Sequence, residues 1–208
     1  MRILVVSATE NEINMLKNFV GENKVLQTVD ILVTGIGGVA TTYSLTKQLH
    51  KTKYDIAFNF GIAGSFNKDL EIGSMVNVTQ EHFADLGAED GENFLSLGEM
   101  GFDGMTEILN ESKIENKILA LIPMVCGITV NKTHGNEKSI EKIFNRFHPN
   151  TESMEGGAFL YCCLQEKIPC AQIRSVSNYV ERRNKDNWNI PLAIENLNHK
   201  AIEILNAF

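Results

Sequence analysis

The sequence predicts an α/β fold with a central, largely parallel sheet. Two consecutive strand, glycine-turn and helix units near the start of the chain are the first evidence for it. The alternation of predicted strands and helices in the last third is the second. The 208 residues, 43% hydrophobic and 22% charged, can build one sizeable core and show no break that requires a second. We therefore expect one domain over residues 1–208.

The first half of the chain supplies the two repeated units. Residues 2–7 form the first predicted strand, and a helix follows because apolar residues recur at helical spacing at Ile13, Leu16, Phe19 and Val20. A buried strand is expected at 30–34, then the turn Gly35-Ile36-Gly37-Gly38, then a helix over 40–49. The strand at 55–60 ends in a second glycine turn at 61–64.

The middle of the chain is less regular. Residues 75–78 read as a strand, and 84–116 are polar and punctuated by glycine, which is typical of a long functional loop with short helical pieces. We interpret this stretch as a lid. Residues 118–129 favour a strand interrupted by Pro123, and 136–147 have helical spacing. The last third then predicts a strand at 151–154, a helix at 155–167, a strand at 170–177 and a closing helix at 190–208.

Charge and composition exclude several classes of protein. The net charge of −7 and the pI near 5.3 argue against a nucleic-acid partner. No apolar run approaches the ~18 residues of a membrane span, and the first strand lacks the length and the preceding basic region of a signal peptide. The four cysteines, Cys126, Cys162, Cys163 and Cys170, lack zinc-site spacing. We therefore expect a reduced, cytoplasmic chain.

Ligands of an open parallel sheet bind at the carboxyl ends of the strands. Polar clusters occupy such ends at residues 9–12, 61–65, 153–155 and 174–178, so the sequence predicts a site built from these segments. Arg174 is the most informative member, because it continues a strand of core residues and would be costly to bury without a carboxylate or a ligand. Glu12 and Glu155 are the available partners.

Simpler explanations compete for some of these features. Acidic residues favour the first turn of a helix, so capping alone can explain Glu12 and Glu155. The turn at 35–38 resembles a dinucleotide-binding turn, but no acidic residue closes the following strand, and a tight turn into a closely packed helix explains it better. His82 and Asp85 have no partner cluster that would complete a metal site.

In this order, the polar clusters resemble the signature of the purine nucleoside phosphorylase and methylthioadenosine/S-adenosylhomocysteine nucleosidase superfamily. Segments 84–91, 127–131 and 177–183, with Trp188-Asn189-Ile190-Pro191, resemble the futalosine hydrolase family in particular. The resemblance implies a single-domain three-layer α/β/α nucleoside phosphorylase-like fold with a central mixed, largely parallel sheet. It also implies a reaction without metal or redox cofactor, and a homo-oligomer, a dimer or higher, whose subunits complete one another's sites.

The resemblance also implies residue roles. Glu12 matches the carboxylate that holds and deprotonates the attacking water, and Arg174 would help to fix both. Glu155 matches the acceptor of the ribose hydroxyls, and Met154 the residue that packs on the sugar. Carboxylates close to the ribose would stabilise the positive charge that grows as the bond to the base breaks. The remaining substrate-binding residues that we expect are Ser153, Ser177, Val130 and Ile62.

Two positions depart from the adenine-releasing nucleosidases. Asn178 stands where they carry an Asp that supports protonation of N7. Its amide supplies no proton easily, but it can donate a hydrogen bond to O6 or N7 of a 6-oxopurine, which favours hypoxanthine over adenine as the released base. Ile62 replaces a Ser in the second glycine turn, which leaves water and sugar binding there open.

Hydrolysis is favoured over phosphorolysis, because residues 7–12 contain no basic side chain and two Glu. The expected reaction is the hydrolysis of futalosine to hypoxanthine and dehypoxanthine futalosine in menaquinone biosynthesis. An adenine-releasing nucleosidase for aminodeoxyfutalosine or methylthioadenosine/S-adenosylhomocysteine is the alternative, and a non-catalytic nucleoside sensor is an alternative of another class. Residues that could bind the benzoate of futalosine are Arg182, Arg183, His82 and Lys132, and Phe94 and Phe102 could cover it.

Overall fold

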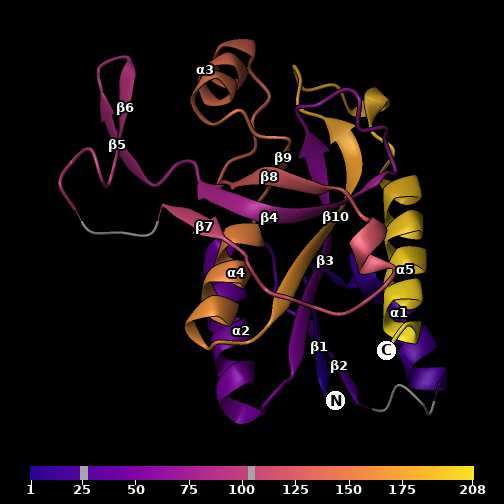
Figure 1. The fold of residues 1–208 in the computed structure, drawn as a ribbon. Helices are drawn as coiled ribbons and strands as arrows, with labels where there is room; N and C mark the ends of the chain where they lie inside the picture. Colours follow the sequence, from indigo (N-terminus) through magenta and orange to yellow (C-terminus); the bar gives the residue numbers. More distant parts are fainter. Residues whose placement is uncertain (24–27, 103–105) are drawn as a thin grey trace.

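The computed structural model describes residues 1–23, 28–102 and 106–208 (Figure 1). Its main sheet has eight strands: β1 (Ile3–Ser7), β2 (Val29–Val33), β3 (Ile56–Ser65), β4 (Met75–Phe83), β7 (Glu107–Leu109), β8 (Met124–Thr129), β9 (Thr151–Ser153) and β10 (Cys170–Tyr179). Five helices accompany it in the described residues: α1 (Glu10–Glu22), α2 (Gly38–Lys51), α3 (Glu137–Phe147), α4 (Gly156–Gln165) and α5 (Ile190–Asn206). The α/β class is confirmed.

The sheet is mixed, as predicted, and partly closes on itself. Parallel pairing joins β2 to β1, β1 to β3, β3 to β10, β4 to β8 and β8 to β9. Antiparallel pairing joins β4 to β10, β3 to β9 and β4 to β7. Because β10 pairs with both β3 and β4, and β9 pairs with both β3 and β8, these five strands form a ring from which β1 and β2 extend.

Helices cover both faces of the β1–β2–β3 part of the sheet (Figure 1). The alternation of β1 shows why, since successive strand residues point to opposite faces. Ile3 and Val5 pack in one apolar cluster with α1 and α5, whereas Leu4 and Val6 pack in a second cluster with α2 and α4. This arrangement directs the beginnings of α1, α2 and α4 toward the same end of the sheet.

The second predicted glycine turn is wrong, because residues 61–64 continue strand β3 to Ser65. Their glycines serve close approach rather than a turn. A Cβ on Gly61 would lie 2.1 Å from Nη1 of Arg174, and one on Gly64 would lie 2.9 Å from Val180. Glycine at these positions therefore makes room for side chains of β10 and of the segment that follows it.

The predicted lid has a different structure from the one expected. Its described part contains no helix but an antiparallel hairpin of β5 (Gly87–Asp90) and β6 (Asn93–Ser96), together with β7. The hairpin projects from the body of the protein (Figure 1). Asp90 pairs with Asn93, so Gly91, with φ of 60°, opens the two-residue loop Gly91-Glu92, and a glycine at the first loop position was the hairpin signal that the loop interpretation missed. Residues 103–105 of the predicted lid lie outside the described residues.

The remaining predicted elements are present with shifted ends. Strand β4 runs five residues beyond the predicted end at Val78, and a short 3₁₀ helix, η2 (Leu119–Leu121), precedes Pro123 and β8. The strand, helix, strand and helix order of the last third is confirmed, with the 3₁₀ helix η3 (Lys185–Asn187) in the loop before α5. Within the described residues, no helix is long and apolar enough to cross a membrane.

Candidate active site

The polar clusters predicted from the sequence meet around one cavity of about 470 Å³. Each cluster supplies part of the wall: Glu12 from α1, Ile62 from β3, Glu155 from the residue before α4, and Asn178 from β10. Other predicted substrate-binding residues that line the same cavity are Ser153, Met154 and Ser177. The expected convergence of these segments is therefore observed.

Glu12 is held at the start of α1 by hydrogen bonds from two elements. The backbone N–H and the hydroxyl of Thr9 donate to Oε2 of Glu12 at 3.0 and 2.8 Å, and together with the bond from Glu12 N–H to Thr9 they form a capping box. The backbone N–H of Ile62 donates to Oε1 at 3.1 Å. That bond comes from β3 and is no part of the cap. This single bond from Ile62 leaves a lone pair of Oε1 free for a donor in the cavity.

Glu155 is held by the first glycine turn. Its Oε1 accepts the backbone N–H of Gly37 at 3.0 Å, and the residue is 7% exposed. Gly37 has φ of 93°, a conformation that favours glycine. A Cβ on the next residue, Gly38, would lie 3.7 Å from Ala158, so α2 and α4 pack closely there. The turn thus leads into a closely packed helix, as expected, and its amide also positions a carboxylate.

Arg174 lies behind the carboxylates and is 1% exposed. Its Nη1 is 3.8 Å from Oε2 of Glu155, and its Nη2 donates to Oδ1 of Asn59 at 2.6 Å. Of the two partners expected from the sequence, Glu155 makes the ion pair, while Glu12 and Arg174 both adjoin the space at Gly61. Arg174 is not among the cavity-lining residues, so its position suits the orientation of Glu155 rather than contact with a ligand.

Asn178 presents a free donor to the cavity. Its Oδ1 accepts the hydroxyl of Ser177 at 2.8 Å, and its Nδ2 donates to the carbonyl of Tyr179 at 2.9 Å. Since an amide nitrogen carries two hydrogens, one of them is left for a ligand. The carbonyl of Tyr179 fixes which way the amide faces, because a carbonyl oxygen only accepts and must therefore meet the NH2.

Comparison with known proteins places the chain in a family. A family model described as the Phosphorylase superfamily matches residues 3–208. This chain belongs to the phosphorylase superfamily. Its superfamily relatives include the futalosine hydrolase of Acidothermus cellulolyticus, 30% identical over 83% of this chain and 73% of the relative. They also include the 5'-methylthioadenosine/S-adenosylhomocysteine nucleosidase of Buchnera aphidicola, 27% identical over 93% and 91%.

Solved structures of the superfamily share the fold. The native structure of futalosine hydrolase of Helicobacter pylori matches with a TM-score of 0.81 at 16% identity. The match covers 100% of this chain and 98% of that chain. A D198N mutant of the Helicobacter pylori nucleosidase, with 5'-methylthioadenosine in its active site, has a TM-score of 0.83 at 17% identity, over 100% and 99%. The relatives make this superfamily member an enzyme of the purine nucleoside N-glycosidase class, a hydrolase.

A buried network in this superfamily member joins the supports of Glu155 and Arg174. Glu81 of β4 accepts the hydroxyl of Thr129 at 2.7 Å and the side-chain N–H of Gln172 at 2.8 Å. Thr129 accepts the N–H of Gly157 in α4 at 2.7 Å, and Gln172 accepts from Arg174 at 3.5 Å. Burial raises the pKa of the Glu81 carboxyl. Sequence reasoning missed Gln172, although its i, i+2 spacing to Arg174 places both on one face of β10.

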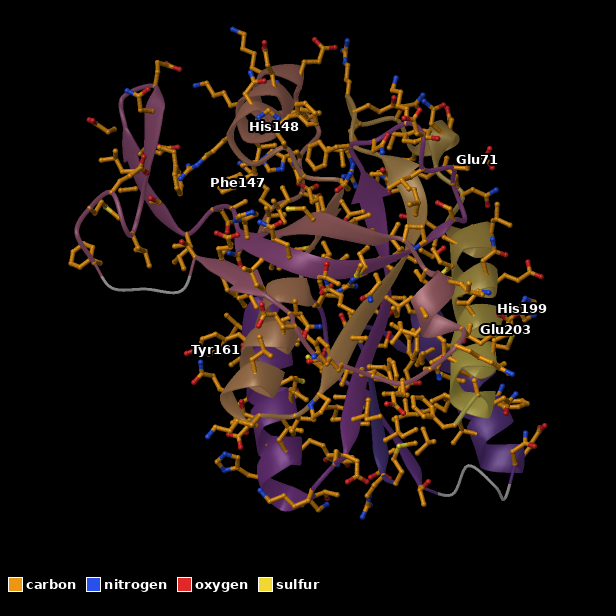
Figure 2. The ribbon with its side chains drawn as sticks, in the orientation of Figure 1. Glu71, Phe147, His148, Tyr161, His199 and Glu203 are labelled. Atoms are coloured by element: carbon orange, nitrogen blue, oxygen red, sulfur yellow. The ribbon has the colours of Figure 1, made fainter. Side chains whose placement is uncertain are left out.

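Other predicted contacts lie elsewhere. Val130 does not line the cavity, because its side chain is 2% exposed and packs with Ala84 and Ile128. Of the four proposed binders of the benzoate, Arg183 lines the cavity and the other three do not. The ring centroids of His82 and Phe147 lie 5.0 Å apart, with the rings tilted by 38°. Phe147 is at the end of α3 (Figure 2). No described residue of 84–116 lines this cavity, so the stretch forms no lid over it here.

A pair of cavity-lining residues had no place in the sequence interpretation. His134 donates its backbone N–H to Glu152 at 2.9 Å, and its ring Nδ1 also bonds to that carboxylate. Glu152 is 4% exposed. The described residues contain no group of three or more His, Cys, Asp and Glu that could hold a metal ion. The described cysteines are all free thiols.

Proposed function

We propose that the protein hydrolyses the N-glycosidic bond of futalosine and releases hypoxanthine and dehypoxanthine futalosine, a reaction of menaquinone biosynthesis that needs no metal or redox cofactor. The observation that carries this proposal is the placement of Glu12 and Glu155 on the wall of one cavity, with the buried Arg174 behind them. The family resemblance of the segments around Asn178 and the relatives named futalosine hydrolase support the choice of substrate.

Glu12 is suited to hold and deprotonate the attacking water. Thr9 occupies Oε2 with two donors, and the single bond from Ile62 leaves Oε1 able to accept from water. The fixed carboxylate loses little orientational freedom when the water binds, which lowers the entropic part of the barrier. No basic side chain occurs in residues 7–12, so the part of the wall around Glu12 offers no cation of its own that would attract phosphate as the nucleophile.

Glu155 is suited to bind the ribose. With Oε1 bonded to Gly37 and Oε2 near Arg174, the carboxylate keeps lone pairs for the sugar hydroxyls. Met154, the preceding residue, lines the same wall and offers an apolar surface to the sugar. As the bond to the base breaks, the ribose gains positive charge, and the pair of carboxylates stabilises that charge.

A base held at Asn178 would receive a hydrogen bond from the free N–H of its amide. For a 6-oxopurine this bond goes to O6 or N7, where the negative charge of the leaving base is delocalised. Arg183 is the cation best placed for the benzoate, because it lines the cavity and its guanidinium lies 4.9 Å over the ring of Trp188, another lining residue. An Arg beside an aromatic ring suits an aromatic carboxylate.

The runner-up is an adenine-releasing nucleosidase acting on aminodeoxyfutalosine or methylthioadenosine/S-adenosylhomocysteine. The relatives named 5'-methylthioadenosine/S-adenosylhomocysteine nucleosidase favour it, since they match 86% to 100% of this chain. Asn178 weighs against it, because an amide supplies no proton to the adenine leaving group.

We also propose that residues 1–208 act as one three-layer domain in a cytoplasmic homo-oligomer. Strands β1 and β3 contribute to both apolar clusters, which supports the single domain. The N-terminal part of α2 exposes Val39 by 83% and Tyr43 by 70%, and Ile36 before it lines the catalytic cavity. A second cavity, of about 770 Å³, runs between α2 and α4 up to Tyr161 on the outer surface (Figure 2). A second subunit on this face would cover Val39 and Tyr43 and complete the wall of the site beside Ile36.

The direct test is incubation of the purified protein with futalosine in the presence and absence of phosphate, with hypoxanthine followed by chromatography. We expect release at the same rate in both cases. Release that requires phosphate would make the protein a phosphorylase. Release of adenine from aminodeoxyfutalosine or methylthioadenosine, with none of hypoxanthine, would establish the runner-up.

A further inference from the structure

The pair His134 and Glu152 lies in the cavity wall and has no role in the mechanism proposed above, although it buries a carboxylate. The Glu152 side chain is 3% exposed and that of His134 is 14% exposed, and both residues line the cavity. Taking a carboxylate out of water is costly unless its oxygens are bonded. Here one oxygen accepts the backbone N–H of His134 and the other accepts Nδ1–H. Both oxygens of the carboxylate therefore bond to His134 and fix the orientation of its imidazole.

The strand register places this pair opposite Asn178. Glu152 of β9 pairs with Gly64 of β3, and Gly64 pairs with Asn178 of β10, so the three residues form one row across adjacent strands. Two strand spacings separate Glu152 from Asn178, a span of about 10 Å. All three residues line the cavity, and Gly64 contributes only backbone between them. The side chain of Val180 covers Gly64 and also lines the cavity, so a flat ring beside Val180 would meet a polar group on each side.

The hydrogen bonds of Glu152 decide what His134 offers to such a ring. A carboxylate accepts only, so Nδ1 carries the proton and Nε2 of the neutral imidazole is an acceptor. None of the described residues bonds to Nε2. A 6-oxopurine has an N–H donor at N1, whereas a 6-aminopurine has an acceptor at N1. The acceptor Nε2 therefore complements the first and opposes the second.

We propose that His134, oriented by Glu152, accepts the N1–H of a 6-oxopurine and so selects hypoxanthine against adenine. The proposal rests on the proposed function for the location of the base, and it adds the residue that reads the base edge remote from the sugar. Asn178 then contacts the O6 or N7 side, and Val180, whose side chain covers Gly64, lies beside the ring.

Glu152→Gln is the most informative variant. The backbone N–H of His134 requires the amide oxygen of Gln at the position of Oε1, which leaves the amide NH2 facing Nδ1. Nδ1 must then accept, so the proton moves to Nε2, and His134 becomes a donor toward the base. The variant should therefore prefer adenine. His134→Phe keeps a ring of similar shape but removes both nitrogens, and it should bind the two bases with similar affinity.

Calorimetric binding of free hypoxanthine and free adenine at pH 8.5, where an ordinary imidazole is neutral, tests this without turnover. Wild type should bind hypoxanthine at least about tenfold more tightly than adenine. His134→Phe should lose most of that ratio, and Glu152→Gln should invert it. The exposed pair His50 and Glu166, 3.3 Å apart, provides matched controls in His50→Phe and Glu166→Gln, which should keep the wild-type ratio.

Thermal unfolding of each variant shows whether it folds. A His134→Phe or Glu152→Gln protein that folds and keeps the wild-type preference would overturn the proposal, as would an equal loss of affinity for both bases. If the wild type binds neither base and releases none from any nucleoside, the proposed function fails. If the wild type releases hypoxanthine from futalosine but His134 has no effect on preference, only this inference fails.

Discussion

Gly37 and Glu155 are joined across 118 residues of sequence by a hydrogen bond from the backbone N–H of one to Oε1 of the other, at 3.0 Å. The bond connects the start of α2 to the residue that precedes α4, and it fixes the carboxylate expected to bind the ribose. The same turn therefore links the α2 surface, which we propose to bind a second subunit, to the sugar site. Association of subunits and sugar binding should depend on each other.

Gly37→Ala should weaken sugar binding. No atom blocks a Cβ at this position, but φ of 93° is strained for any residue with a side chain, at a cost of about 1–3 kcal/mol. If the turn relaxes, its amide leaves Glu155, so KM should rise more than the loss of stability explains. Steady-state kinetics and urea unfolding measure both effects. Gly21→Ala in α1, also without a blocking atom, is the matched control, and unchanged kinetics in both variants would contradict this role.

Gly61→Ala should nearly abolish turnover. Its Cβ would fall 2.1 Å from Nη1 of Arg174 and 3.3 Å from Oε1 of Glu12, so the guanidinium must move away from Glu155. A misplacement of about 1 Å in an active site can cost roughly a hundredfold in rate. Single-turnover assays should show that loss. Gly98→Ala, on an open turn, is the control. A variant that folds and turns over normally would show that Arg174 need not hold its observed place.

These positions show how much of the structure could be predicted from the sequence. The order of strands and helices and the convergence of four polar clusters followed from local patterns, because each pattern lies within a few residues. The continuation of β3 through residues 61–65 could not be foreseen, since those glycines make room for Arg174, which is more than a hundred residues away. The contact between His134 and Glu152 was missed for a similar reason, because helix α3 separates the two residues in the sequence.

Glu81→Gln should change the dependence of stability on pH. Burial raises the folded-state pKa of Glu81 above the ordinary 4.5. Below pH 4.5 both states hold the proton, and as the pH rises the unfolded chain releases it first, so the folded state loses stability until the pH passes the folded-state pKa. The variant lacks this loss. Urea unfolding between pH 4.5 and 8 should therefore show the wild type losing stability relative to Glu81→Gln as the pH rises.

The exposed Glu89 of β5 gives the control for the loss of one charge, as Glu89→Gln. If the difference in the free energy of unfolding between the wild type and Glu81→Gln stays constant across the pH series, the burial of Glu81 has no effect on its titration. Turnover should also fall in Glu81→Gln, because one of its two donors, Thr129 or Gln172, must then face an amide NH2.

Asn178→Asp should reduce hypoxanthine release by roughly tenfold to a hundredfold. The Asp would lose the N–H that Asn178 donates, and an ionised carboxylate would repel O6 of the base. Its oxygen would also face the carbonyl of Tyr179, which now accepts from Nδ2 at 2.9 Å. Release of hypoxanthine and of adenine from matched nucleosides gives the measurement. A gain of adenine release with no loss of hypoxanthine release would disprove this account of base selection.

Arg183→Met should raise the KM for futalosine by about tenfold and leave inosine almost unaffected, because inosine has no benzoate for the guanidinium to bind. Methionine keeps an apolar stem against Trp188, over which the guanidinium lies at 4.9 Å, so packing is disturbed little. Arg182→Met removes the neighbouring charge from a residue that does not line the catalytic cavity, and its KM should stay at the wild-type value. Equal effects of the two changes would indicate general attraction of an anion. A rise in KM for inosine as well would place Arg183 at the sugar or the base instead of the benzoate.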